Sequence, residues 1–212
     1  MDGAAFRETV EDEKATQLNR LGSEKLLVGL TDATLETERV LEVAALSEHA
    51  ARETFRAWAA DEGDDDARHA FEAVAEQEDE HLRRVLDALH REDEPDSTDG
   101  GPMHAYLRGR EDTVERVAGG MVGRPLVSVR THTQVISYFV NEQDRARADL
   151  FRDLKAETAD VIDDGLALLE SRCATDEDWE RAEMVAEYVI QVAYDDYADS
   201  LRDLGLDPKP LC

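Results

Sequence analysis

The stretch FEAVAEQEDEHLRRVLDAL, residues 71–89, says more about the fold of this chain than any other segment. Its apolar side chains recur every three or four residues, as on one face of an α-helix: Phe71, Val74, Leu82, Val85 and Leu89. Glu78 and His81 lie three residues apart on this same face. The stretch therefore predicts an amphipathic helix whose buried face carries a carboxylate and an imidazole.

A carboxylate also interrupts the apolar stripe of the preceding helical segment, which runs Leu41, Ala44, Glu48, Ala51, Phe55 and Trp58. Burying an unpaired carboxylate is costly, so Glu48 and Glu78 both need partners. A Glu from one helix and a Glu-x-x-His from its neighbour supply half of a carboxylate-bridged dimetal site in a helical bundle. We therefore predict that Glu48, Glu78 and His81 are metal ligands. The alternatives are a metal-free Glu–His hydrogen bond, or a register that leaves Glu78 in solvent.

The composition is strongly acidic, because 51 Asp and Glu residues face 24 Lys and Arg residues and give a formal net charge of −27. Lysine is scarce and limited to Lys14, Lys25, Lys155 and Lys209. Self-repulsion of this size is tolerated when salt screens it, over a Debye length of ~3 Å at 1 M. The composition therefore indicates a halophilic cytosol. A basic partner on one acidic face is the weaker interpretation, since the acid is spread along the whole chain.

Several classes of function are disfavoured by the same sequence. Nucleic-acid binding needs basic patches, which this chain lacks. No apolar run approaches the ~20 residues that span a membrane, and the N-terminus shows no secretory signal, so we expect a cytoplasmic protein. Cys173 and Cys212 are the only cysteines, which excludes a zinc ribbon or an iron–thiolate module and predicts reduced thiols.

The chain reads as helices with almost no strand signals, and its 212 residues fit a single domain. We expect four segments: an N-terminal docking helix within 1–30, a helix hairpin over 32–91, a linker and crossover helix over 92–124, and a second hairpin over 125–205. The connection between the hairpins contains its own short helix, long enough to cross the bundle. The prediction is an all-α four-helix bundle in which the second and third helices run parallel.

Helix ends are placed by capping and breaking residues. Thr31 and Asp32 are expected to cap the first long helix, which should end near Asp61. In the second hairpin one helical pattern extends from Pro125 to Arg172, so a kink is expected near Asn141 or Gly165. The last helix should span 176–204.

The block SEHAARETF, residues 47–55, followed by the EDEH of residues 78–81, resembles the first half-site of the rubrerythrin branch of the ferritin-like superfamily. That half-site has a Glu, then Ala-Arg and an aromatic residue, and then Glu-x-x-His on the next helix. The chain is also similar to acidic members from salt-loving archaea. The resemblance implies a ferritin-like four-helix bundle that binds iron or manganese, with Glu48 as a terminal or bridging ligand, Glu78 as the bridge and His81 as the nitrogen ligand.

The second half of the chain departs from the family pattern. A full site needs another Glu and another Glu-x-x-His, but the only histidine after residue 104 is His132, which does not complete that motif. A rubredoxin module is also missing, since it needs four cysteines. Residue numbers along the helices indicate which positions lie level with Glu48 along the bundle axis. On the third helix this position is near Glu157, which is a further candidate ligand. On the last helix the residues near this level are Glu187, Gln191 and Asp195, and Asp195 is kept as a candidate.

Any of these acids could instead be solvated. The remaining histidines are expected at the surface or at helix ends: His49, His69, His90 and His104.

Two functions from different classes follow. The first is a ferritin-like metal-binding protein with an incomplete site for iron or manganese, which would also accept zinc. If redox-active it would act as an oxidase or peroxidase, with oxygen or peroxide as its small-molecule oxidant, or serve in iron handling. The second is a metal-free helical scaffold or binding protein. Whether the chain is an enzyme is left open by the sequence.

We also expect a homodimer, which is the habit of the family that the chain resembles. The N-terminal segment adds surplus apolar surface, at Leu18, Leu21, Leu26, Leu27, Val28 and Leu30. The alternative is that this segment folds over the open edge of its own bundle.

Overall fold

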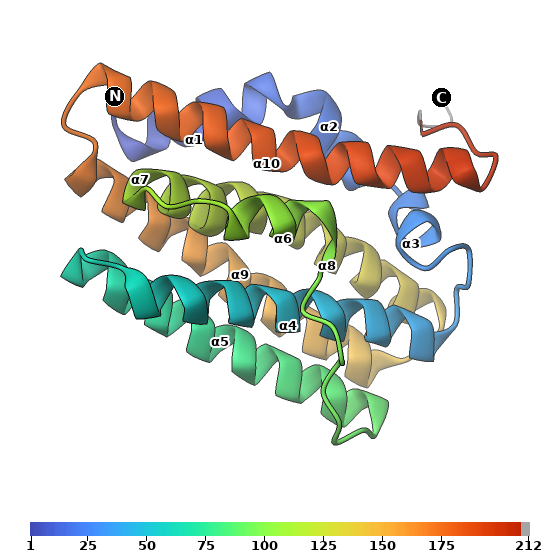
Figure 1. Ribbon diagram of the computed structural model, residues 1–212. Coiled ribbons are helices and arrows are strands. Elements are labelled where there is room, and N and C mark those ends of the chain that lie inside the picture. The colour runs from blue at the N-terminus through green and yellow to red at the C-terminus, as the bar shows by residue number, and fades with distance from the viewer. Residues whose placement is uncertain (209–212) are drawn as a thin grey trace.

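A computed structural model describes residues 1–208 and shows helices joined by turns, with no strand in that range. The all-α prediction is therefore confirmed. Helix α4 (Thr37–Asp61) and helix α5 (Asp65–Leu89) form an antiparallel hairpin, as expected (Figure 1). The turn between them is short, and the carboxylate of Asp64 caps α5 by accepting a hydrogen bond from the backbone N–H of Ala67 at 3.0 Å.

The second hairpin differs from the prediction. The helix expected from Pro125 to Arg172 is two antiparallel helices, α8 (Arg124–Asn141) and α9 (Arg145–Arg172). Between them Gln143 adopts a left-handed backbone conformation, with φ of 60°, and the carboxylate of Asp144 accepts a hydrogen bond from Arg147 N–H at 3.1 Å. The apolar pattern continues across this turn because both helices face one core, so periodicity alone did not reveal the reversal.

Residues 90–123 connect the two hairpins. The single crossover helix expected over about 103–117 is divided into α6 (Gly101–Arg108), α7 (Thr113–Arg116) and the π-helix η1 (Val117–Gly123). The carboxylate of Asp112 caps α7, and α7, η1 and α8 then follow one another without interruption. In Figure 1, α5 and α8 run in the same direction, which is the parallel relation that the crossover was expected to produce.

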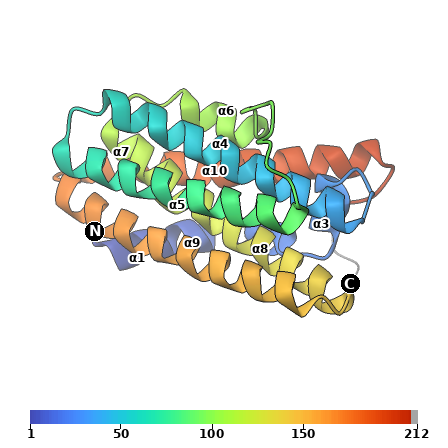
Figure 2. The same cartoon turned by 90° about the horizontal axis from the view of Figure 1, so that it is seen from below.

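Helix α10 (Asp176–Asp203) begins where the sequence predicted, at a capping box formed by Thr175 and Asp178. Its place in the fold differs from the prediction, because α8 and α9 already complete the second hairpin. Helix α10 instead packs along η1 and α6, on the side of the molecule away from α5 (Figure 1). Figure 2 shows α4, α5 and α9 side by side, with α8 next to α9.

The N-terminal segment forms three short helices: α1 (Gly3–Glu13), α2 (Ala15–Leu21) and α3 (Lys25–Leu30). The cap expected at Thr31 and Asp32 is wrong, because Asp32 has a positive φ of 50° and α4 begins only at Thr37. The leucines of the segment pack against the chain's own core, with Leu18, Leu21, Leu26 and Leu27 buried and Val28 and Leu30 partly buried. The segment thus covers its own bundle, and the homodimer stays a prediction.

Two further expectations concern the membrane and the cysteines. Within residues 1–208, no helix is long and apolar enough to cross a bilayer. Cys173 is a free thiol, and burial, with a smaller contribution from Asp178, raises its pKa to about 11. Cys212 lies outside the described residues.

Candidate metal centre

Helix α4 places Glu48 in the interior of the bundle. The apolar residues one turn before and after it, Ala44 and Ala51, are buried, and so are Phe55 and Trp58 further along the same stripe. The small alanines leave room for a longer side chain between them. Glu48 is consequently only 4% exposed, as its place in the stripe predicted.

Helix α5 contributes Glu78 and His81 from its buried face, and both residues are 0% exposed. Their spacing of three residues sets the two side chains next to each other on the helix surface. Because α4 and α5 pack as a hairpin, this face of α5 meets the face of α4 that carries Glu48. The three residues that the sequence grouped as ligands therefore lie together.

The ligand atoms of the three residues form one compact cluster. One atom from each of Glu48, Glu78 and His81 lies within 4.8 Å of the other two. The Nδ1 atom of His81 is 3.8 Å from Glu48 Oε2 and 3.9 Å from Glu78 Oε2. Ligands bound to one ion at a tetrahedral angle are roughly 3.4 Å apart, given bond lengths of about 2.0–2.2 Å. A small inward movement of the side chains would bring these atoms to that separation.

Hydrogen bonding within the cluster is incomplete. Neither Glu78 Oε2 nor His81 Nδ1 has a hydrogen-bond partner, although both atoms are buried. Buried polar atoms are nearly always paired, and leaving one unpaired costs about 1–3 kcal/mol. A cation between these atoms and Glu48 would satisfy them. The cluster of Glu48, Glu78 and His81 could therefore hold a metal ion.

Glu157 reaches the cluster from α9, on the opposite edge of the His81 ring. Its Oε2 atom lies 2.7 Å from His81 Nε2, and both of its oxygens accept from Arg84 Nη1 at 3.0 Å. A carboxylate in this position fixes the ring orientation and the tautomer of a metal-binding histidine. Glu157, which the sequence predicted as a candidate ligand, thus contacts a residue of the cluster. The structure places it behind the imidazole rather than among the clustered ligand atoms.

Helix α8 brings two residues to the cluster that the sequence analysis did not assign to it. Arg124 is 2% exposed and donates from Nη2 to Glu78 Oε1 at 2.7 Å. His132 lies about two turns further along, with Nε2 at 3.3 Å from Glu48 Oε1. The signal for His132 was present, since it shares a helical stripe with the buried Val135 and Phe139. Nothing in the local pattern indicated that Arg124 would be buried.

Charges in the cluster are strongly coupled. Burial alone would raise the pKa of Glu48, but the hydrogen bond with His132 and the nearby His81 imidazole outweigh it and hold that pKa well below its ordinary value. Burial raises the pKa of Glu78 to about 8, although Arg124 opposes this shift. Desolvation works against protonation of His81, yet its carboxylate neighbours, above all Glu48, raise its pKa to about 9. With both pKa values above 7, a metal ion bound by Glu78 and His81 at neutral pH would displace protons from both groups.

The remaining candidates lie elsewhere. Asp195 is exposed on α10 and accepts a hydrogen bond from Gln191 at 2.9 Å. It lies away from the cluster because α10 is not one of the helices that surround it. His69 and His90 are exposed, as expected. His49 and His104 are buried, contrary to the prediction, since the crossover segment and α6 cover this side of α4.

Comparison with known proteins does not assign the chain to a family. No family model, no curated protein and no solved structure matched it. What the site can do therefore follows from its own residues. Two buried carboxylates and one imidazole form a cluster that could bind a metal.

Proposed function

We propose that this chain is a ferritin-like metalloprotein of the rubrerythrin branch that holds one iron or manganese ion between Glu48, Glu78 and His81. The observation that carries the proposal is the pair of unpartnered atoms, Glu78 Oε2 and His81 Nδ1, within a cluster shielded from solvent. Carboxylate oxygens with one imidazole suit iron and manganese, and also zinc.

The helix arrangement supports the ferritin-like assignment. Bundles of that kind consist of two antiparallel hairpins joined by a long crossover, with ligands on facing helices. Here α4 and α5 form one hairpin and α8 and α9 the other, with α6 in the connection. Glu48 comes from the first helix and the Glu-x-x-His pair from the second.

The second hairpin supports a mononuclear rather than a dinuclear centre. Where a complete site would present a further Glu and Glu-x-x-His, α8 presents Arg124 and His132, and α9 presents Glu157. The guanidinium of Arg124 already pairs with Glu78 Oε1, so that oxygen is engaged by a permanent cation. A second metal ion next to it would be repelled.

The residues around the cluster would then orient the three ligands by hydrogen bonds. Glu157 accepts a hydrogen bond from His81 Nε2–H, which leaves Nδ1 directed at Glu48 and Glu78. His132 holds the second oxygen of Glu48, and Arg124 holds the second oxygen of Glu78. When bound, a redox-active ion would supply electrons for the reduction of oxygen or peroxide.

Elemental analysis of protein purified in molar salt tests this proposal. We expect close to one transition-metal ion per chain in the wild type and almost none in a Glu78→Gln/His81→Gln variant. The matched control is Glu80→Gln/His69→Gln, which changes the same residue types on the exposed face of the same helix and should keep the metal. Equal and negligible metal in all three proteins would refute the proposal.

One observation favours a second function, a metal-free helical scaffold. Arg124 brings a positive charge into the cluster, and a protonated His81 would bring another, so the carboxylates have partners without a metal. Such a protein would keep the bundle but gain no stability from metal ions. A titration with metal ions that follows the thermal unfolding midpoint separates the two functions.

A further inference from the structure

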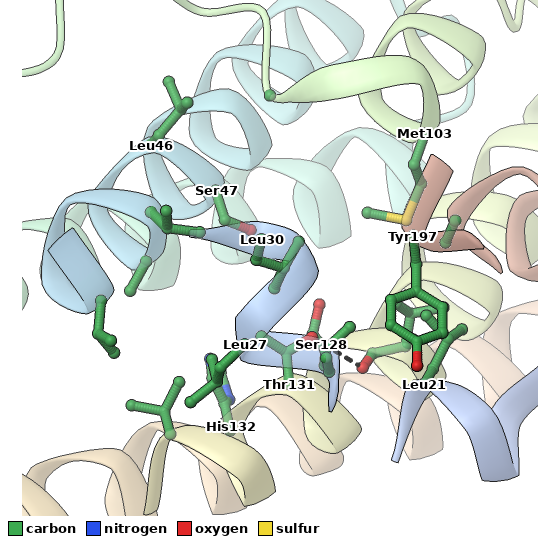
Figure 3. Close-up of a pocket in the computed structure, with 18 of the residues that line it drawn as sticks. Leu21, Leu27, Leu30, Leu46, Ser47, Met103, Ser128, Thr131, His132 and Tyr197 are labelled. Carbon is green, nitrogen blue, oxygen red and sulfur yellow. Dashed lines mark hydrogen bonds between the residues drawn. The ribbon is translucent and has the colours of Figure 1, made fainter. Parts of the chain in front are cut away.

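A pocket of about 260 Å³ opens beside the cluster, on the side of α4 and α8 that faces α3. Figure 3 shows residues from several helices around it. Helix α3 contributes Leu27 and Leu30, α6 contributes Met103, and α10 contributes Tyr197. The pocket therefore lies where the N-terminal segment and the crossover cover the gap between the two hairpins.

Most of the wall is aliphatic. Leucine and valine side chains from α3, α4 and α8 supply much of this aliphatic surface, among them Leu30, Val43, Leu46 and Val127. An apolar cavity of about 150 Å³ is large enough to hold benzene, so this pocket exceeds that size. Drug-sized ligands usually occupy about 300–1,000 Å³, so the fitting molecule is smaller than those. An aliphatic chain of roughly eight carbons is within this range.

The polar part of the wall is concentrated on α4 and α8. Glu48 and His132 line the pocket, and their side chains contact each other through Oε1 and Nε2 at 3.3 Å. Ser47, Ser128 and Thr131 add hydroxyl groups nearby (Figure 3). A group that joins this pair must donate to the carboxylate and accept from the imidazole, and a hydroxyl does both.

The charges around the pocket disfavour an anion. Three carboxylates line it, those of Glu42, Glu48 and Asp196, against the single guanidinium of Arg39. Burial, together with Asp199 and Asp99, raises the pKa of Asp196, which indicates that further negative charge is unfavourable there. An organic cation would have to lose its hydration among aliphatic side chains, which is costly.

We infer that this pocket binds a neutral aliphatic molecule of medium length that carries a terminal hydroxyl, with the hydroxyl at Glu48 and His132 and the chain along the leucines and valines. The inference rests on the aliphatic lining of the pocket and on the position of Glu48 and His132 at one end of it. It goes beyond the proposed function. The hydroxyl site uses Glu48 Oε1, whereas Glu48 Oε2 is the oxygen that faces His81 Nδ1, so binding in the pocket does not require a metal in the cluster.

Isothermal titration calorimetry in molar potassium chloride tests the inference with 1-octanol as the probe. We expect one octanol per chain, and at least tenfold weaker binding of two molecules of similar length. Octanoate carries a charge that the acidic pocket repels, and heptyl methyl ether cannot donate a hydrogen bond. Equal or tighter binding of octanoate, or equal binding of the ether, would overturn the inference.

Two variants locate the site. Ser128→Phe and Ser47→Phe fill the pocket from α8 and α4 respectively, and each should weaken octanol binding at least tenfold. Ser137→Phe is the matched control, because Ser137 is an exposed serine on the same helix α8, and it should bind octanol as the wild type does. Wild-type affinity in both pocket variants would overturn the inference.

Metal content measured on the same wild-type samples keeps the two proposals apart. Octanol binding by protein without metal would count against the proposed function alone. Failure to bind octanol by protein that retains its metal would overturn the pocket inference alone.

Discussion

Arg124 has the least typical environment of any charged residue near the cluster. It is buried, pairs with Glu78, donates from Nε to the carbonyl of Gly120 at 3.2 Å, and lies over the ring of Phe55. A buried ion pair gains little net stability because both charges must be desolvated, yet removing one partner leaves the other uncompensated. Above its pKa of about 8, where Glu78 is charged, it therefore depends on Arg124 as long as no metal is bound.

Replacing this arginine gives a direct prediction. At about pH 9, where Glu78 is charged, Arg124→Met should lower the free energy of unfolding of the metal-free protein by about 3–5 kcal/mol, because Glu78 remains buried without its cation. Urea unfolding in molar salt measures the change. Adding manganous ion should recover part of the loss, since the ion supplies positive charge to the same carboxylate. A loss below about 1 kcal/mol would show that Glu78 is accommodated in another way, for instance by protonation.

His104 makes a second residue-level prediction, which concerns pH. Burial, with smaller contributions from Arg124 and Arg108, lowers its pKa from 6.5 to about 3, so the folded protein holds the neutral ring. Its contribution to stability is therefore complete above pH 6.5 and is lost as the pH falls from there towards 3. When the pH falls from 7 to 5, the free energy of unfolding of the wild type should drop by about 2 kcal/mol more than that of His104→Leu, because leucine has no group that takes up a proton in the unfolded state. Parallel pH profiles for the two proteins would contradict this account.

The residues of the cluster could be predicted because each interrupts a regular apolar stripe. Glu48, Glu78 and His81 are conspicuous for that reason, and so is His132 once its stripe with Val135 is followed. Arg124 could not be predicted, since its burial depends on a carboxylate of another helix. Asp195 was predicted on the premise that the last helix belongs to the four around the site, a place that α8 takes instead.

At the scale of the elements, η1 is the feature that most affects the site. Its residues 117–123 are all buried, and Arg124 follows directly after it. Glycines allow the close packing around this segment: a Cβ at Gly120 would lie 2.5 Å from the Trp58 ring. Without a side chain at this position, η1 can approach α4 closely.

Gly165 of α9 tests how tight this packing is. A Cβ there would lie 2.7 Å from Met121 Cβ and 3.1 Å from the Met121 carbonyl oxygen, and the backbone cannot easily yield. Gly165→Ala should therefore lower the free energy of unfolding by about 1–3 kcal/mol. The control is Gly63→Ala in the α4–α5 turn, where a Cβ meets nothing within 4 Å. Urea unfolding of both variants should show the loss only for Gly165→Ala, and equal midpoints would contradict the packing described.

Helix boundaries were predictable where capping residues mark them and unpredictable where a turn has no such mark. Asp64 and Thr175 cap helices that begin close to the expected positions. The turn at residues 142–144 contains neither Gly nor Pro, and it depends on Gln143 adopting a left-handed conformation. A glutamine gives little indication of such a turn, since left-handed backbone is uncommon outside glycine and asparagine.

At the scale of the whole molecule, the net charge of −27 decides how the fold responds to salt. Many carboxylates pair with arginines on the surface, such as Asp64 and Asp66 with Arg172, but the acids outnumber the bases about two to one. Exposed pairs of this kind contribute little. The unpaired acids repel one another over a distance that grows as salt is removed.

The thermal unfolding midpoint should consequently be many degrees higher in molar potassium chloride than at tens of millimolar. The Debye length falls from roughly 30 Å at 0.01 M to about 3 Å at 1 M, so screening removes most of the repulsion. Differential scanning calorimetry across this range measures the effect. A midpoint independent of salt would mean that the arginine pairs already balance the acids, and would contradict the halophilic interpretation.

The central claim is that the buried cluster binds one metal ion, and an anaerobic titration of the metal-stripped protein tests it most directly. Ferrous or manganous ion is added in molar salt while the thermal unfolding midpoint is followed. A ligand that binds only the native state must stabilise it, so the midpoint should rise and saturate at one ion per chain. His81→Gln should abolish the rise, whereas His69→Gln should not. A wild-type midpoint that does not change with either ion, or that rises equally in His81→Gln, would contradict the account.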